Sequence, residues 1–250
     1  MKILVCFIIL VTGSGYAWTA CEVPSPLREV KLVEKIWPQN KDFKIVASII
    51  DGDIYSSREQ KYQLSIKLVS AHEKAASLIA SVCIPDVGSY NKFKVAELES
   101  LQIDTAPYTV SDDTTAFGVR VRLTRRYNAV YNEVIETINL IEYKNSDLKP
   151  ILTNMVVSIN QSECYVECSG KSYKFWGRTI LISAITFHGY HTLRVKENAE
   201  EGTWKLEPAN KESSDNSTYT GRAKSKVRKN YWIHFNGKEY IVPAELMFRG

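Results

Sequence analysis

The stretch Tyr231-Trp-Ile-His-Phe-Asn-Gly-Lys-Glu-Tyr-Ile-Val242 decides the fold of this chain. Its centre, Asn236-Gly237, is typical of a two-residue type I′ turn, and β-branched and aromatic residues lie on both sides of it. Such a turn predicts an antiparallel hairpin in which His234 lies opposite Glu239. One face of this hairpin would carry aromatic and aliphatic side chains, as expected for strands that cover a core.

Working outward, the same two-residue alternation recurs along the chain. Apolar residues alternate with polar ones from Tyr62 to Leu68 and again from Phe117 to Leu123, which is typical of strands with one face in water. Further strands are predicted in these β-branched and aromatic runs: 134–143, 151–159, 172–185 and 191–196. The pattern predicts an all-β or β-dominated fold of antiparallel meanders and hairpins, and a sandwich and a propeller-like stack both remain open.

Two segments have the spacing of short helices. Ser25-Pro26 precedes apolar residues at three- and four-residue steps that end at Trp37, and Ser70-Ala-His-Glu73 has the form of a capping box. The second segment could equally be a strand from Leu78 to Ile84. The polar segment Asn198–Thr220 is predicted to be a long exposed loop.

The first twenty residues have the form of a secretory signal peptide. Lys2 precedes an apolar run from Ile3 to Val11 that is too short to span a bilayer, and small residues follow it. We therefore expect export, with residues 21–250 as a single β-rich domain. Two mature forms remain open, a soluble protein and one with a lipid anchor at Cys21.

Composition excludes several classes of protein. The chain has 250 residues and a net charge of +4, which is too mild to indicate nucleic-acid binding, and no mature segment is apolar enough for a transmembrane span. The four cysteines outside the leader favour disulfides over a metal site in an oxidising compartment. The candidate pairs are Cys164 with Cys168 and Cys21 with Cys83.

No catalytic, metal-binding or cofactor-binding motif is recognisable in the sequence. His188 and His191 lie three residues apart around Gly189, which indicates a turn rather than a helical pair of metal ligands. The sequence therefore predicts no metal and no cofactor. Acid–base candidates for a hydrolase are Asp51, Asp53, His188, His234 and Glu239.

Basic and aromatic residues form the strongest binding signal. Basic residues recur at every second position from Arg222 through Lys224 and Lys226 to Arg228, which on a strand would form one cationic stripe. Such a stripe suits an acidic partner, although basic residues also protect edge strands from unwanted pairing. Four further residues are predicted as anchors, because Trp, Tyr and Arg often dominate interfaces: Trp176, Arg178, Tyr190 and Trp232.

Five stretches together resemble a family of exported, uncharacterised proteins of Gram-negative bacteria. They begin at Ala116, Leu148, Gly170, His188 and Phe235, and the resemblance covers roughly residues 104–246. The resemblance implies a periplasmic location and supplies no activity.

These observations favour a non-enzymatic binding protein of the bacterial envelope, with a protein partner and without nucleic acid. Such a protein could be an inhibitor or an immunity-type partner of a periplasmic protein. The alternative is a cell-envelope hydrolase that uses carboxylate and histidine residues for acid–base chemistry.

Overall fold

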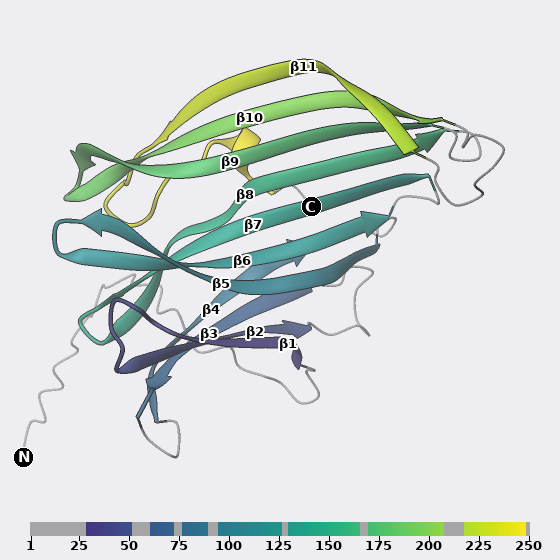
Figure 1. Ribbon diagram of the computed structural model, residues 1–250. Coiled ribbons are helices and arrows are strands. Elements are labelled where there is room, and N and C mark those ends of the chain that lie inside the picture. The colour runs from purple at the N-terminus through teal and green to yellow at the C-terminus, as the bar shows by residue number, and fades with distance from the viewer. Residues whose placement is uncertain are drawn as a thin grey trace, which may run out of the picture.

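The chain forms two antiparallel β-sheets in a computed structural model, which describes residues 29–51, 61–72, 77–89, 95–126, 130–165, 170–207 and 218–248 (Figure 1). The smaller sheet contains β1 (Glu29–Ile36), β2 (Phe43–Asp51), β3 (Lys61–Ser70) and β4 (Leu78–Ser89). The larger sheet contains β5 (Val95–Ser111), β6 (Thr114–Arg126), β7 (Tyr131–Lys144), β8 (Asp147–Tyr165), β9 (Gly170–Phe187), β10 (Tyr190–Glu207) and β11 (Thr218–Ile233). Within each sheet, strands that are neighbours in sequence are neighbours in space. The prediction of a β-dominated fold is therefore confirmed.

The main core lies between the two sheets. Phe117, Val119 and Val121 alternate along β6 with no exposed surface and pack into one cluster with the inner residues of β2, β3 and β4, such as Ile45 and Leu64. This arrangement is a packed pair of sheets, so of the two open architectures the sandwich is the one observed. The alternation from Phe117 to Leu123 that predicted a strand is the part of β6 that fills this core.

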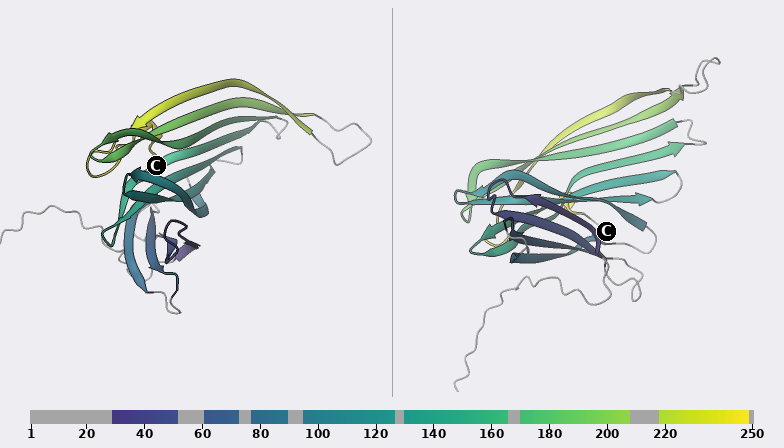
Figure 2. Two further views of the ribbon diagram at one scale, coloured as in Figure 1. Left: turned by 60° about the vertical axis from the view of Figure 1, so that its left-hand side comes forward. Right: turned by 60° about the horizontal axis from the view of Figure 1, so that its bottom comes forward.

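A second core lies against the curved half of the larger sheet. Leu193, Ile233, Phe235, Tyr240 and Leu246 belong to it, and each is at most 3% exposed. The chain after β11 runs beneath the curved sheet and ends in a single turn of 3-10 helix, Ala244–Leu246 (Figures 1 and 2). The C-terminal segment thus supplies the layer that the smaller sheet does not provide at this end.

The turn at Asn236-Gly237 forms, but its register differs from the predicted one. The N–H of Asn236 donates to the carbonyl of Glu239 at 3.0 Å, and Phe235 is bridged to Tyr240. Asn236 therefore precedes the two central residues of the turn instead of being one of them. Its Oδ1 accepts the N–H groups of the residues two and three positions later, at 2.8 and 2.9 Å, which stabilises this shifted turn.

The predicted pairing of His234 with Glu239 is consequently wrong. The carbonyl of His234 instead accepts the N–H of Ile241 at 3.0 Å, so His234 lies opposite Ile241. Regular pairing also stops here, because β11 ends at Ile233.

The first predicted helix is wrong, and residues 73–76 of the second segment lie outside the described chain. Residues 29–36 form the edge strand β1, in which Lys31 and Val33 are partly buried and the others are exposed, and residues 25–28 lie outside the described chain. The three-residue spacing of Val30 and Val33 looked helical, but pairing with β2 and burial against the core favour a strand for this β-branched run. The strand alternative for the second segment is confirmed by β4, which begins at Leu78.

The predicted loop Asn198–Thr220 is also largely a strand. β10 continues to Glu207 and β11 begins at Thr218, and residues 208–217 lie outside the described chain. The polar composition predicts a loop, but a strand forms because the acidic residues of β10 face basic residues of β11. Glu200, for example, lies 3.5 Å from Lys226.

Candidate functional site

Alternate residues of β10 and β11 form one exposed face of the larger sheet, which we call the Trp232 face: Arg194, Lys196, Arg228, Asn230 and Trp232. The register pairs Arg194 with Trp232 and Lys196 with Asn230. Arg228 lies two residues before Asn230 on the same strand. Residues directly opposite each other in an antiparallel pair project from the same side of the sheet. The face lies at the outer rim of the curved sheet (Figure 1).

The Trp232 face joins an exposed aromatic ring to a fixed guanidinium group. Trp232 is 46% exposed, and the Arg194 guanidinium carbon lies 5.5 Å from the centre of its ring. Arg194 also donates from Nε and Nη2 to Asn230 Oδ1 at 3.2 and 3.0 Å. These contacts hold the cation beside the ring, an arrangement suited to binding carboxylates next to an apolar surface.

Two further cations on this face have no acidic partner among the residues that the structure describes. Lys196 and Arg228 are exposed, and neither forms an ion pair or a side-chain hydrogen bond within the described part of the chain. The face therefore presents uncompensated positive charge around Trp232.

The predicted stripe from Arg222 to Arg228 is interrupted. A register shift opposite Glu201 and Gly202 leaves Lys224 without a residue opposite it, so the two-residue alternation breaks at that position. Lys226 pairs with Glu200 and Arg228 with Asn198, whereas the register places Arg222 opposite Thr203, in the other phase. The side chains of Arg222 and Lys224 lie outside the described part of the molecule, so the single stripe stays a prediction for them, while Lys226 and Arg228 share the side of Trp232.

Arg178 and Trp176 lie on the opposite side of the sheet from the Trp232 face. Arg178 pairs with Glu197, which is adjacent to Lys196 on β10 and so projects from the other side. The Arg178 Nη2 lies 2.7 Å from Glu197 Oε2, Nη1 donates to the carbonyl of Val156 at 2.9 Å, and the two side chains are only 6% and 5% exposed. Arg178 is thus enclosed in a buried ion pair that holds β8, β9 and β10 together.

Tyr190 lies at the end of the molecule where several turns meet. Its hydroxyl donates to Glu142 Oε2 at 2.6 Å, and its ring stacks on Phe235 with 3.9 Å between the centres. Burial, followed by this hydrogen bond, raises the pKa of Tyr190. A pocket of about 350 Å³ opens beside it and is also lined by Lys144 and Lys149. The sequence does not predict Glu142 and Lys149 as site residues, because they lie on β7 and β8 and only the fold brings them beside Tyr190.

His188, His191 and His234 lie near the same turns, and His191 Nε2 lies 3.5 Å from Asp112 Oδ1, whereas the predicted pair of His234 with Glu239 does not form. His234 Nδ1 lies 3.2 Å from Thr192 Oγ1, and its ring contacts Phe187. His188 follows Phe187 in the β9–β10 turn, while Asp51 is the last residue of β2 and Asp53 lies outside the described chain. Among the described residues, no group of three histidine, cysteine or acidic side chains is arranged to hold a metal ion.

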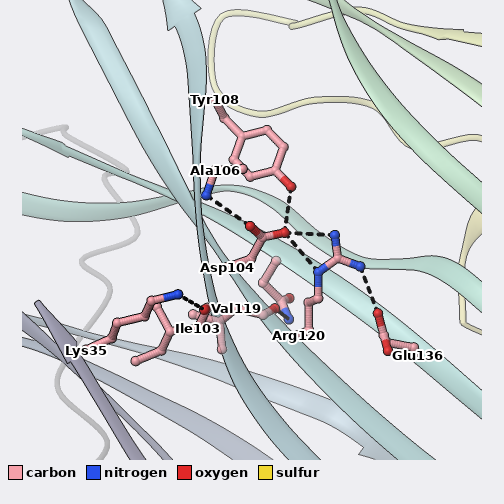
Figure 3. A network of polar contacts seen from close by, with 9 residues as sticks. Lys35, Ile103, Asp104, Ala106, Tyr108, Val119, Arg120 and Glu136 are labelled. Atoms are coloured by element: carbon pink, nitrogen blue, oxygen red, sulfur yellow. Dashed lines mark hydrogen bonds and ion pairs between the residues drawn. The ribbon is translucent and has the colours of Figure 1, made fainter. Parts of the chain in front are cut away.

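A polar cluster missed by the sequence reasoning lies on β5, β6 and β7 (Figure 3). Arg120 donates from Nε and Nη2 to Asp104 Oδ2 at 2.9 and 2.8 Å and from Nη1 to Glu136 at 2.8 Å. Asp104 also accepts the Tyr108 hydroxyl at 2.8 Å and the N–H of Ala106 at 3.0 Å.

This Arg120 cluster fixes an irregular part of β5. A step of four residues from Asp104 to Tyr108 corresponds to a step of only two residues on β6, so the chain bulges there. Burial raises the pKa of Tyr108 to about 12, with the hydrogen bond to Asp104 acting in the same direction. Burial works to raise the pKa of Asp104, but its hydrogen bonds, first to the Ala106 N–H and then to Arg120, lower it overall. The ion pairs and hydrogen bonds of the cluster therefore stabilise the bulge, and a pocket of about 310 Å³ lies beside it.

The predicted disulfides stay predictions. Cys83 lies on β4 with its Sγ 3.9 Å from Gln63 Oε1, and Cys21, the Cys164 side chain and Cys168 lie outside the described part of the molecule. No disulfide joins two described side chains.

Fold and surface together define a β-rich protein of two packed sheets with one aromatic and basic face on the rim of the larger sheet. Within the described residues, no helix is both long and apolar enough to cross a membrane. Comparison with known proteins gave no matching family model, no similar curated protein and no similar solved structure. The likeness to exported proteins of Gram-negative bacteria stays an expectation drawn from the sequence motifs.

Proposed function

We propose that this protein is an exported, non-enzymatic binding protein of the bacterial envelope that holds an acidic protein partner on the Trp232 face. The observation that carries the proposal is the position of Lys196. It is exposed and unpaired within the described chain, and it lies on β10, which has a strand on each side. Protection of a sheet edge explains basic residues on β11, but it does not explain one on an interior strand.

The chemistry of the face supports a protein partner. Trp and Arg are enriched among residues that contribute most to protein interfaces, because they combine apolar area with directional hydrogen bonds. Trp232 offers the apolar area, and Arg194 offers a guanidinium group held by Asn230. Lys196 and Arg228 flank them and would raise the rate of encounter with an acidic surface.

The expected export supports the location, and the absence of a recognisable catalytic motif supports a role in inhibition. A protein with these properties suits an inhibitor or an immunity-type partner of a periplasmic enzyme, which acts by covering a cleft with a few anchor residues. The one acid–base pair that the sequence predicted for the alternative hydrolase does not form, since His234 lies opposite Ile241 and not opposite Glu239.

The test uses the mature protein with a photo-crosslinking residue in place of Thr179, which is exposed and pairs with Lys196 on the same side of the sheet. It is irradiated in an envelope extract, the cross-linked protein is identified and purified, and its affinity is measured by calorimetry. We expect a partner with an acidic surface, at least a tenfold loss of affinity in Trp232→Ala and in Lys196→Glu, and weakening at higher salt. The activity of the purified partner, measured with and without the protein, tests inhibition.

Lys67→Glu is the matched control, because Lys67 is exposed on β3 of the other sheet and the charge change is the same. It should leave the affinity within twofold. A partner that binds Trp232→Ala and Lys196→Glu as tightly as the wild type would refute the proposed face.

A further inference from the structure

The two outer edges of the larger sheet differ. β5 forms one edge, and side chains from the smaller sheet and the turn after β1 cover its backbone carbonyl groups. Lys31 Nζ donates to the carbonyl of Glu99 at 2.7 Å, and Gln39 Nε2 donates to that of Thr105 at 3.2 Å. Figure 3 shows a third such contact, from Lys35 to Ile103. The β5 edge is therefore occupied within the molecule.

The β11 edge is bare along the part of the chain that the structure describes. β11 pairs with β10 on one side, and no described residue makes a hydrogen bond to the backbone of its other side. Every residue from Lys226 to Asn230 is exposed, so neither face of the strand is covered there. Alternate residues of an edge strand direct their N–H and C=O groups outward, where these groups can form hydrogen bonds with another strand.

We propose that an extended acidic segment of the partner protein adds to the larger sheet as a strand beside β11. The backbone of this segment would pair with the outward groups of β11, and its carboxylates would lie opposite Arg228 and Lys226. The proposal rests on the function proposed above and specifies how the partner binds.

Charge decides which strand can bind at this edge. A second copy of β11 would bring Lys226 and Arg228 of one molecule close to those of the other, and like charges on adjacent strands are destabilising. An acidic segment reverses the sign of each of these contacts. The same basic residues therefore exclude self-association and select an acidic strand.

Exposed apolar side chains lie on both faces of the strand. Val227 is 43% exposed and projects from the opposite face to Arg228, while Trp232 lies on the same face as Arg228. A segment that alternates acidic and β-branched residues would match charge on one face and apolar area on the other.

The probe is a fluorescent heptapeptide of alternating glutamate and valine, and a heptapeptide of alternating lysine and valine is its matched control. Binding to the mature protein is measured by anisotropy, and hydrogen–deuterium exchange is followed for the β11 amides. We expect the glutamate peptide to bind, the lysine peptide not to bind, and exchange within 226–232 to slow at least tenfold at saturation. Arg228→Glu should weaken binding at least tenfold, whereas Lys67→Glu should change it by less than twofold.

The outcomes separate this proposal from the proposed function. Binding of the glutamate peptide without slower exchange in β11 would overturn strand addition and leave docking on the Trp232 face intact. Equal binding of both peptides, or no binding up to millimolar concentration, would also overturn it. If the cross-linked partner depends on Lys196 but leaves β11 exchange unchanged, the function holds and the edge inference fails.

Discussion

Breaking the buried pair of Arg178 and Glu197 should strongly destabilise the larger sheet. Replacing Glu197 by Leu would leave a guanidinium group that is only 6% exposed with the Val156 carbonyl as its remaining partner. Removal of one member of a buried ion pair typically costs about 3–5 kcal/mol, because the remaining charge has lost its partner without regaining water. We expect a loss of this size in the free energy of unfolding.

The assay is urea unfolding, monitored by tryptophan fluorescence, of the wild type, Arg178→Met, Glu197→Leu and the double variant. With a slope of about 2–3 kcal/mol per molar urea, each single change should lower the midpoint by about 1–2 M. The double variant should lose much less than the sum of the two, because it removes both charges together. A coupling energy of about 2 kcal/mol or more is expected.

The exposed pair of Arg122 and Glu99 provides the control. It joins the same two residue types at 3.1 Å, but its side chains are 42% and 43% exposed, so Arg122→Met should cost less than about 1 kcal/mol. If Arg178→Met costs as little as this control and instead abolishes partner binding, the reasoning is refuted. Arg178 would then be the binding anchor that the sequence predicted.

Three further predictions concern the core of the larger sheet. Because burial raises the pKa of Tyr108 to about 12, the folded protein holds this proton more tightly than the unfolded chain, in which a tyrosine has its ordinary pKa of about 10. The resulting stabilisation, about 2–3 kcal/mol, is fully present below a pH of about 10 and is lost as the pH rises to about 12. In Tyr108→Phe the fall of the urea midpoint over this pH range should be smaller by this contribution. Parallel curves of urea midpoint against pH for the wild type and Tyr108→Phe would contradict the assignment. Gly118→Ala would place Cβ 3.1 Å from Cβ of Asp104, which the Arg120 cluster fixes, and should cost about 1–3 kcal/mol; an unchanged melting temperature would show that Asp104 can move. Asn139 is fully buried and its Oδ1 accepts the N–H of Asn154 at 2.9 Å, so Asn139→Ala should cost about 1–3 kcal/mol in urea unfolding.

The sequence predicted a strand in β6 because burial alternates there. From Phe117 to Leu123 every second residue is buried in the core, so the alternation within this one segment is enough to predict a strand. The edge strand β1 lacks that evidence, because most of its residues are exposed and its conformation depends on pairing with β2. A local pattern cannot show a partner strand, so the apolar spacing near Val30 and Val33 predicts a helix where the structure has a strand.

The Arg120 cluster could not be predicted for a related reason. Asp104, Arg120 and Glu136 come from three strands, and they meet because β5 bulges between Asp104 and Tyr108. Bulges change the register without a strong signal in the sequence. The register shift at Lys224 likewise interrupts the two-residue alternation that the basic residues from Arg222 to Arg228 predict.

The positions of the basic residues favour the proposed binding surface over a merely protected edge. Protection requires charge only on β11, where a neighbouring strand could add. Arg194 and Lys196 lie on β10, which already pairs on both sides, yet they project from the same side of the sheet as Arg228 and Trp232. Lys196 makes no ion pair within the described chain, so folding gains nothing evident from its charge, and a threonine would suit the strand better. Positive charge that the sheet does not use, placed beside an exposed tryptophan, is what an acidic partner would require.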